Sequence, residues 1–284
     1  MRRIELDDGT VLCVDSFGDT GDPAILLMGG ATSSMDWWEV DFCRRLADAG
    51  RFVVRFDARD TGESSHWPVG KPGYTGEDLS LDPLRVLDAL GVASAHLVGV
   101  SMGGGIAQDL AVRFPDRVLS VTLIATTAAF DRAGEDDLPG PESRIQQLMQ
   151  DDEPDLDWGD EDAVVDRMVE VQGAFAGSLG LDDTVPEIAR QVVRRTPDVQ
   201  ASVTNHWVVI GGGEGEPHAM SEITAPTLVV HGTDDPMFPL PHGEMLAREI
   251  AGARLVAVEG MGHEVPPRPT WDVVVPALVE HTAP

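Results

Sequence analysis

The residues best suited to chemistry lie in the stretch "AHLVGVSMGGGIAQDLA", residues 95–111, where a single hydroxyl, Ser101, stands between Gly99 and Gly103. The apolar run before the serine predicts a strand, and the pattern after it predicts a helix. Glycines two residues before and two after such a sharp corner relieve crowding of the backbone. The corner residue is then held in strained geometry with its side chain beyond the carboxyl end of the sheet. This serine is either a packing feature or a nucleophile.

A serine hydroxyl is a weak nucleophile unless a base removes its proton and an acid orients that base. "LVVHGTDDPMFP" places Asp234 and Asp235 just after an apolar strand, and "VAVEGMGHEVPP" places His263 in a glycine-flanked loop after the next strand. Each also has a plainer interpretation, as a turn residue or a solvated loop histidine. Because Ser, Asp and His follow the carboxyl ends of predicted strands in the order that such triads require, we interpret these groups as a catalytic triad. The amide of Met102, at the start of the predicted helix, would then bind an oxyanion.

The elements around these residues decide how they can meet. Strands are predicted at 10–18, 24–30, 51–57, 95–100, 118–126, 226–232 and 253–260, and helices at about 35–49, 78–90, 102–114, 241–251 and 270–281. Several strands are continuously apolar, as expected for strands covered on both faces of a parallel sheet. The sequence therefore predicts an α/β fold with a mostly parallel, doubly wound sheet.

Residues 128–222 break this alternation. They contain two acid-rich segments, "DRAGEDDLPGPE" and "DDEPDLDWGDED", and helix-like patterns near 141–150, 160–177, 184–196 and 198–209. A structureless loop of this length would be unusual in a compact fold. We therefore predict a core domain from residues 1–127 and 223–284 and an inserted helical cap from residues 128–222. "GGGEGE", residues 211–216, is interpreted as a flexible hinge of the cap.

A cap over the edge of the sheet would form the roof of a substrate pocket. The candidate lining side chains are large or polarisable, and they are Trp37, Trp38, Met149, Trp158, Phe175, His206 and Trp207. Packing within the protein is the alternative role for each of them. Together they predict a fairly large apolar cavity.

Five segments resemble the landmarks of the α/β-hydrolase family in the family's order: "LLMGG", "FDARDTGES", "HLVGVSMGG", "HGTDDPMFP" and "GMGHEVPP". Within the family they are most similar to the branch that holds aclacinomycin methylesterase, a cofactor-free esterase acting on an anthracycline methyl ester. The resemblance covers nearly the whole chain. It implies Ser101 as the nucleophile, Asp235 as the acid and His263 as the base, with Asp234 as the main alternative acid.

The resemblance also implies that the backbone of Gly30 and of Met102 supplies the oxyanion donors. Many family members carry His-Gly at the first oxyanion loop, whereas this chain has Met28-Gly29-Gly30. Because the donor is a backbone N–H group, this departure does not prevent the oxyanion hole from forming.

These residues predict a serine hydrolase that cleaves carboxylic esters of small molecules without a cofactor, a bulky polyketide-like methyl ester among them. The same triad could serve a cofactor-free haloperoxidase or perhydrolase, or a hydrolase of lactones or C–C bonds. A ligand-binding receptor on the same scaffold is the alternative from a different class.

Composition narrows the choice of partners. The net charge of −29 opposes binding to the phosphate backbone of a nucleic acid. The 284 residues hold no apolar run of about 18 residues and no apolar core behind the first arginines, so we expect neither a membrane span nor a signal peptide. Cys13 and Cys43 fit free thiols in the cytoplasm. No spacing predicts a metal site, and we expect a monomer or a homodimer.

Overall fold

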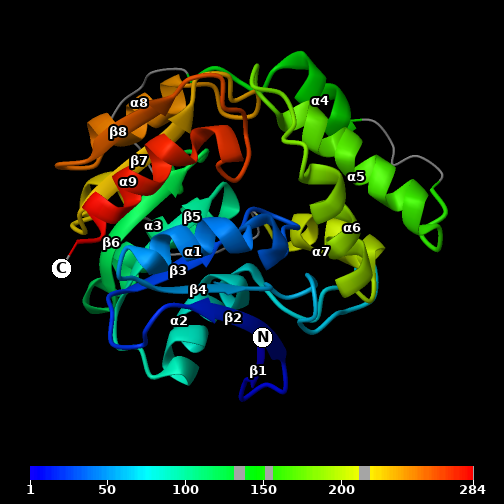
Figure 1. Cartoon of the computed structure of the whole chain (residues 1–284), viewed down its shortest axis with the longest axis horizontal. Helices are drawn as coiled ribbons and strands as arrows, with labels where there is room; N and C mark the ends of the chain where they lie inside the picture. Colours follow the sequence, from blue (N-terminus) through cyan, green and yellow to red (C-terminus); the bar gives the residue numbers. More distant parts are fainter. Residues whose placement is uncertain (131–137, 151–155, 211–217, 284) are drawn as a thin grey trace.

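The computed structural model describes residues 1–130, 138–150, 156–210 and 218–283 (Figure 1). In this part of the chain, eight strands form one sheet in the order β1-β2-β4-β3-β5-β6-β7-β8. They are Arg2–Glu5 (β1), Val11–Phe17 (β2), Ala24–Met28 (β3), Phe52–Phe56 (β4), Ala95–Val100 (β5), Val118–Ile124 (β6), Thr227–Gly232 (β7) and Arg254–Val258 (β8). β2 pairs antiparallel with β1 and β4, and the remaining pairs are parallel. The predicted mostly parallel sheet is confirmed.

The burial of each strand explains whether it could be predicted from the sequence. Every residue of β3, β4, β5 and β7 is buried, which matches their mainly apolar sequences. β1 was not predicted. Only Ile4 of this edge strand is buried, and three charged residues accompany it, so it lacks an apolar run.

Helices cover both faces of the sheet. They are α1 (Val40–Asp48), α2 (Gly76–Leu90), α3 (Met102–Arg113), α8 (Pro241–Glu249) and α9 (Trp271–His281). Buried residues of α2, α3 and α8 share one hydrophobic cluster with the sheet, and those of α1 and α9 share a second cluster on its other face. This is the predicted doubly wound arrangement. Short 3-10 helices occur at Met35–Trp37, Pro115–Arg117, Met220–Glu222 and Arg268–Thr270.

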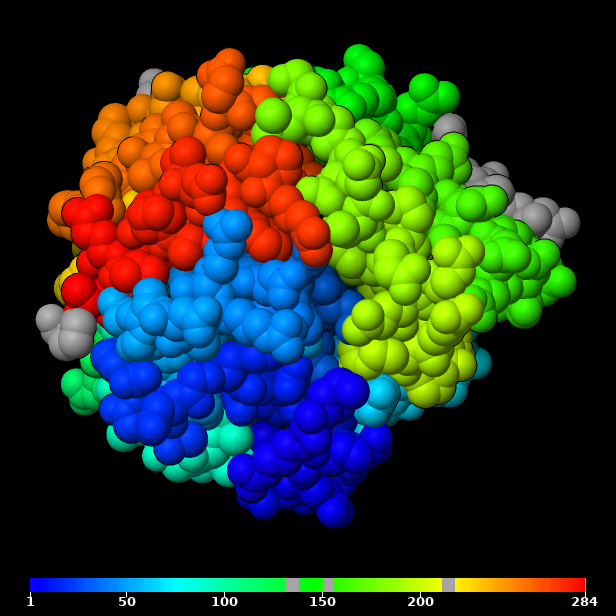
Figure 2. Space-filling model, viewed as in Figure 1, coloured from blue at the N-terminus to red at the C-terminus, as the bar shows by residue number. Residues whose placement is uncertain are grey.

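Between β6 and β7 the chain forms α4 (Ser143–Gln150), α5 (Glu161–Phe175), α6 (Val185–Arg195) and α7 (Val199–Val209), which we call the lobe. Figure 1 shows the lobe, green to yellow, beside the sheet. In Figure 2 it packs against both N-terminal segments in blue and C-terminal segments in red. The helices agree with the predicted ones to within a few residues. The division into a core and a cap domain remains a prediction, and the segment 211–216 lies outside the described residues.

None of the helices in the described ranges has the length and apolar character needed to cross a membrane.

Candidate active site

Ser101 occupies the corner between β5 and α3, with a φ of 52°. This left-handed conformation is strained for a residue with a side chain. The flanking glycines are required by close contacts: a β-carbon on Gly99 would lie 2.1 Å from the carbonyl oxygen of Gly103, and one on Gly103 would lie 2.6 Å from that of Gly29. The hydroxyl of Thr126 donates to the Ser101 carbonyl at 2.8 Å and helps to hold the corner. The geometry is therefore that of a serine presented at the end of a strand.

His263 and Asp235 are in direct contact. Nδ1 of His263 lies 3.0 Å from Oδ2 and 3.2 Å from Oδ1 of the Asp235 carboxylate. Asp235 is buried, and its Oδ1 also accepts the amides of Met237 at 2.9 Å and Phe238 at 2.8 Å. Burial opposes the charge on this carboxylate, but the hydrogen bond and charge of His263 outweigh burial and lower the pKa of Asp235. An imidazole whose Nδ1 faces a carboxylate has its Nε2 free to act as a base.

The neighbouring acid, Asp234, has a different role. Its carboxylate accepts the Ser178 amide at 3.1 Å and the Thr233 hydroxyl at 3.0 Å. Ser178 follows α5, so Asp234 connects the end of β7 to the lobe. Of the two candidate acids, Asp235 is the one in contact with His263.

The three proposed catalytic groups share one edge of the sheet. β5, β6, β7 and β8 are adjacent and parallel, and Ser101, Asp235 and His263 follow the carboxyl ends of β5, β7 and β8. The structure brings Asp235 and His263 into contact and places Ser101 at the same edge. Their action as one triad remains a prediction.

The two residues expected to supply oxyanion donors lie beside Ser101. A β-carbon built on Gly30 would lie 3.4 Å from the β-carbon of Ser101, so the backbone at Gly30 approaches the serine closely. Met102 is the first residue of α3, and the first amides of a helix have no acceptor within it. Both positions therefore suit donors to an oxyanion formed at Ser101, which remains a prediction.

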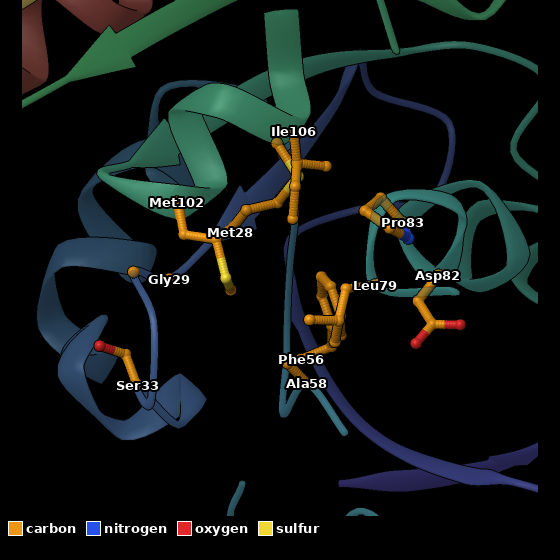
Figure 3. Close-up of a pocket in the computed structure, with 11 residues that line it drawn as sticks. Met28, Gly29, Ser33, Phe56, Ala58, Leu79, Asp82, Pro83, Met102 and Ile106 are labelled. Atoms are coloured by element: carbon orange, nitrogen blue, oxygen red, sulfur yellow. The ribbon is translucent and has the colours of Figure 1, made fainter. Parts of the chain in front are cut away.

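A pocket adjoins these two residues (Figure 3). Figure 3 shows Met28, Met102 and Ile106 on one side of it and Leu79 and Pro83 of α2 on the other. The complete lining lies outside the lobe and is mainly apolar: Met28, Gly29, Gly30, Ser33, Phe56, Ala58, Leu79, Asp82, Pro83, Met102 and Ile106. Sequence reasoning looked for the lining chiefly in the lobe. The apolar residues next to "MGG" and in the first turns after Ser101 were the features of the sequence that could have indicated this lining.

Two expected lining residues belong to the interior instead, which corrects the prediction. Trp38 is buried and packs against Phe42 with ring centroids 5.5 Å apart. His206 is buried, and both its ring nitrogens lie within hydrogen-bond distance of backbone atoms. Burial of this kind leaves neither side chain a surface for substrate.

The other expected lining residues differ in exposure. Trp37 and Trp158 are half-buried, whereas Met149 and Trp207 are exposed, at 56% and 54%. Of these residues, Phe175 is the one in contact with the proposed catalytic base. Its ring centroid lies 5.6 Å from that of His263, and its carbonyl oxygen accepts the His263 amide at 2.9 Å.

Phe238 is a site residue that sequence reasoning missed. Its ring lies 5.3 Å from the His263 ring on an edge-to-face approach, and its amide donates to Asp235. His231 donates to the Phe238 carbonyl at 2.7 Å, which holds this loop in place. An aromatic residue three positions after Asp235 was the only signal in the sequence. Phe175 and Phe238 thus both flank the imidazole.

Among the described residues, no group of three His, Cys, Asp or Glu side chains is arranged to hold a metal ion.

Comparison with known proteins places this site in a family. The family described as alpha/beta hydrolase fold matches residues 23–162, and one described as TAP-like protein matches residues 200–275. Rhodomycin D methylesterase DauP from Streptomyces sp. (strain C5) is 33% identical over 93% of this chain and 92% of its own length. The corresponding enzyme DnrP from Streptomyces peucetius is 32% identical, with the same coverage. The chain belongs to the α/β-hydrolase family.

This α/β hydrolase also shares its fold with solved structures. The enol-lactonase from Burkholderia xenovorans LB400 has a TM-score of 0.72 and 24% identity, and the match covers 99% of both chains. The 2-hydroxy-6-oxo-6-phenylhexa-2,4-dienoate hydrolase from Rhodococcus sp. strain RHA1 has a TM-score of 0.71 and 22% identity, covering 96% of this chain and 94% of that one. These structures support the fold. The matches to the two methylesterases, which cover 93% of the chain, confirm the family resemblance predicted from the motifs.

Proposed function

We propose that this α/β hydrolase cleaves carboxylic esters through Ser101, His263 and Asp235. The observation that carries the proposal is the contact of His263 with the buried Asp235 at the sheet edge where Ser101 forms a strained corner. A base oriented by a carboxylate beside a presented hydroxyl is the arrangement that acyl transfer requires.

The reaction follows from these roles. His263 takes the proton of the Ser101 hydroxyl while the serine oxygen attacks the ester carbonyl. The oxyanion that forms accepts hydrogen bonds from the backbone amides of Gly30 and Met102. His263 then gives that proton to the departing alcohol, leaving an acyl group on Ser101. Water, deprotonated by His263, attacks the acyl group and releases the carboxylic acid. Asp235 stabilises the imidazolium in both halves.

For the substrate we propose a methyl ester of a bulky small molecule. Two relatives aligned over nearly the whole chain are rhodomycin D methylesterases, which supports a methyl ester. The apolar pocket beside Gly30 and Met102, together with the rings of Phe175 and Phe238, offers apolar surface for a large acid component. We further propose a cytoplasmic enzyme that needs no cofactor and acts as a monomer or a homodimer. The buried free thiols of Cys13 and Cys43 support that location.

The test is hydrolysis of p-nitrophenyl acetate by Ser101→Ala. We expect kcat/KM to fall by at least about 10⁴-fold, because the attacking oxygen is lost. Ser221→Ala, at an exposed serine, is the matched control and should retain the activity of the unmodified protein. Unchanged turnover in Ser101→Ala would exclude the mechanism. Bromination of monochlorodimedone in acetate, peroxide and bromide, faster than ester hydrolysis, would instead support the perhydrolase alternative.

A further inference from the structure

A buried histidine of the lobe contacts two loops that follow strands β3 and β4. Nδ1 of His206, in α7, accepts the amide of Thr32 at 2.8 Å, and Nε2 lies 2.7 Å from the carbonyl oxygen of Arg59. Because Nδ1 accepts a backbone proton, the ring proton must be on Nε2, which donates to Arg59. His206 is completely buried, and burial lowers its pKa, so the ring is neutral.

The Thr32 amide belongs to the turn that begins at Gly30. The Ser33 amide donates to the Gly30 carbonyl at 3.2 Å, which closes a four-residue turn, and Thr32 is its third residue with a φ of 64°. A positive φ at this position favours glycine or asparagine, and a β-branched residue is strained there. A strained conformation persists when the surrounding structure holds it. The hydrogen bond from Thr32 to His206 is such a restraint.

A second set of lobe contacts holds the chain just beyond the turn. Gln191 of α6 donates to Asp36 at 2.7 Å, and Arg195 of α6 forms ion pairs with Asp36 and Asp57, the latter at 2.6 Å. Asp57 in turn accepts the Met35 amide at 2.9 Å. The lobe therefore holds the segment from Thr32 to Asp36, which begins two residues after Gly30.

We propose that His206 is a positioning residue for the oxyanion hole: by accepting the Thr32 amide, it fixes the turn whose first residue, Gly30, offers its amide to the oxyanion. The inference rests on the proposed ester hydrolysis. Gly30 approaches Ser101 so closely that a shift of the turn moves the donor relative to the attacked carbonyl. Misplacement of a reacting group by about 1 Å can cost about 100-fold in rate.

Two variants separate the two hydrogen bonds of His206. Asparagine places its side-chain oxygen where Nδ1 lies in histidine, so His206→Asn keeps an acceptor for Thr32 and loses the donor to Arg59. Glutamine places its amide nitrogen near Nε2, so His206→Gln keeps the donor and loses the acceptor. Both replace a buried ring with a smaller amide, so their effects on folding should be similar. Val208→Ala, at an exposed position of α7, is the control for the helix.

We expect His206→Gln to lower kcat for p-nitrophenyl acetate by about 10- to 100-fold with little change in KM, since removal of an entire oxyanion donor costs about 100- to 1000-fold. His206→Asn should stay within a few-fold of the unmodified protein, as should Val208→Ala. Equal losses of kcat in the Asn and Gln variants, or losses that follow the melting temperature, would overturn the inference.

Hydrogen exchange of the Thr32 amide gives a second readout that needs no substrate. It should become faster in His206→Gln and stay slow in His206→Asn, and equal protection in the two variants would contradict the inference. Failure of the proposed function looks different. In that case the unmodified protein would not hydrolyse the ester, or Ser101→Ala would still do so, whatever the exchange of Thr32.

Discussion

Two attachments of the lobe, among the described residues, are made in different ways. After α5, most of the attachment is made by backbone atoms: Phe175 accepts the His263 amide, and the Leu179 amide donates to the Gly260 carbonyl at 3.1 Å. The Asp234 carboxylate adds its bond from the Ser178 amide. At α6 and α7, the attachment is made by side chains, chiefly the largely buried Arg195 and the fully buried His206. The first attachment lies against the loop of the proposed base, and the second lies against the loop of the proposed oxyanion donor.

The backbone attachment depends on the absence of side chains. A β-carbon on Gly177 would lie 2.2 Å from the carbonyl oxygen of Gly260, and one on Gly262 would lie 2.3 Å from the amide nitrogen of Gly177. The side-chain attachment depends instead on charges that compensate each other. Burial raises the pKa of Asp57, and the charge of Arg195 opposes that rise. One attachment should therefore be sensitive to added volume and the other to lost charge.

The largest effect is expected from Arg195→Met. It would leave Asp36 and Asp57 buried without their cation, and breaking a buried ion pair in this way costs about 3–5 kcal/mol of unfolding free energy. Arg194→Met is the matched control, because Arg194 is 61% exposed and pairs with Glu161 at the surface, where a pair contributes at most about 1 kcal/mol. Urea denaturation of both variants makes the comparison. Similar losses in the two would show that the buried cluster does not hold the lobe.

A smaller loss is expected from Gly177→Ala. Its β-carbon would push the lobe backbone away from Gly260, and overpacking of this kind costs about 1–3 kcal/mol. The His263 loop should move with it and lower kcat. Gly173→Ala, in α5, is the control, since its β-carbon would meet only Leu181 at 3.6 Å and the helix would gain up to about 1 kcal/mol. Denaturation and ester hydrolysis by the two variants should diverge. Equal behaviour would mean that the backbone contact is not tight.

The smallest effect concerns pH and separates the two attachments directly. The pKa of His206 is lower in the folded protein than in the unfolded chain, so the folded state loses stability as pH falls below the unfolded value of about 6.5. Protection of the Thr32 amide should then weaken by up to about tenfold per pH unit between about pH 6.5 and 5. Protection of the His263 amide, which donates to a backbone carbonyl, should follow this trend less steeply. In His206→Asn, protection of the Thr32 amide should no longer fall with pH. If it falls as steeply as in the unmodified protein, protonation of His206 is not the cause.

The sheet and the proposed catalytic residues were predictable because their signals are local. Mainly apolar runs indicated β3, β4, β5 and β7, and the glycines around Ser101 indicated the corner. β1 was missed because a charged edge strand has no such run. The order of the motifs also predicted Asp235 and His263, which the structure brings into contact, although the sequence alone left Asp234 as an alternative acid.

The lobe attachments could not be predicted, because their partners are far apart in the chain. Arg195 and Asp57 are 138 residues apart, and Thr32 and His206 are 174 apart. No periodicity connects such pairs, and a histidine on a helix gives no indication that it will accept a backbone amide from the core. For the same reason His206 was assigned to the substrate pocket, and the pocket lining from α2 was overlooked.

The most direct test of the central claim is to find which residue becomes acylated or phosphonylated. A fluorophosphonate should form a P–O bond with the Ser101 oxygen and release fluoride, and peptide mapping should find the phosphonyl group on Ser101. Ester hydrolysis should fall in proportion to the fraction labelled, and Ser101→Ala should take up no label. Label on another residue, or full hydrolysis by protein labelled completely at Ser101, would contradict the account.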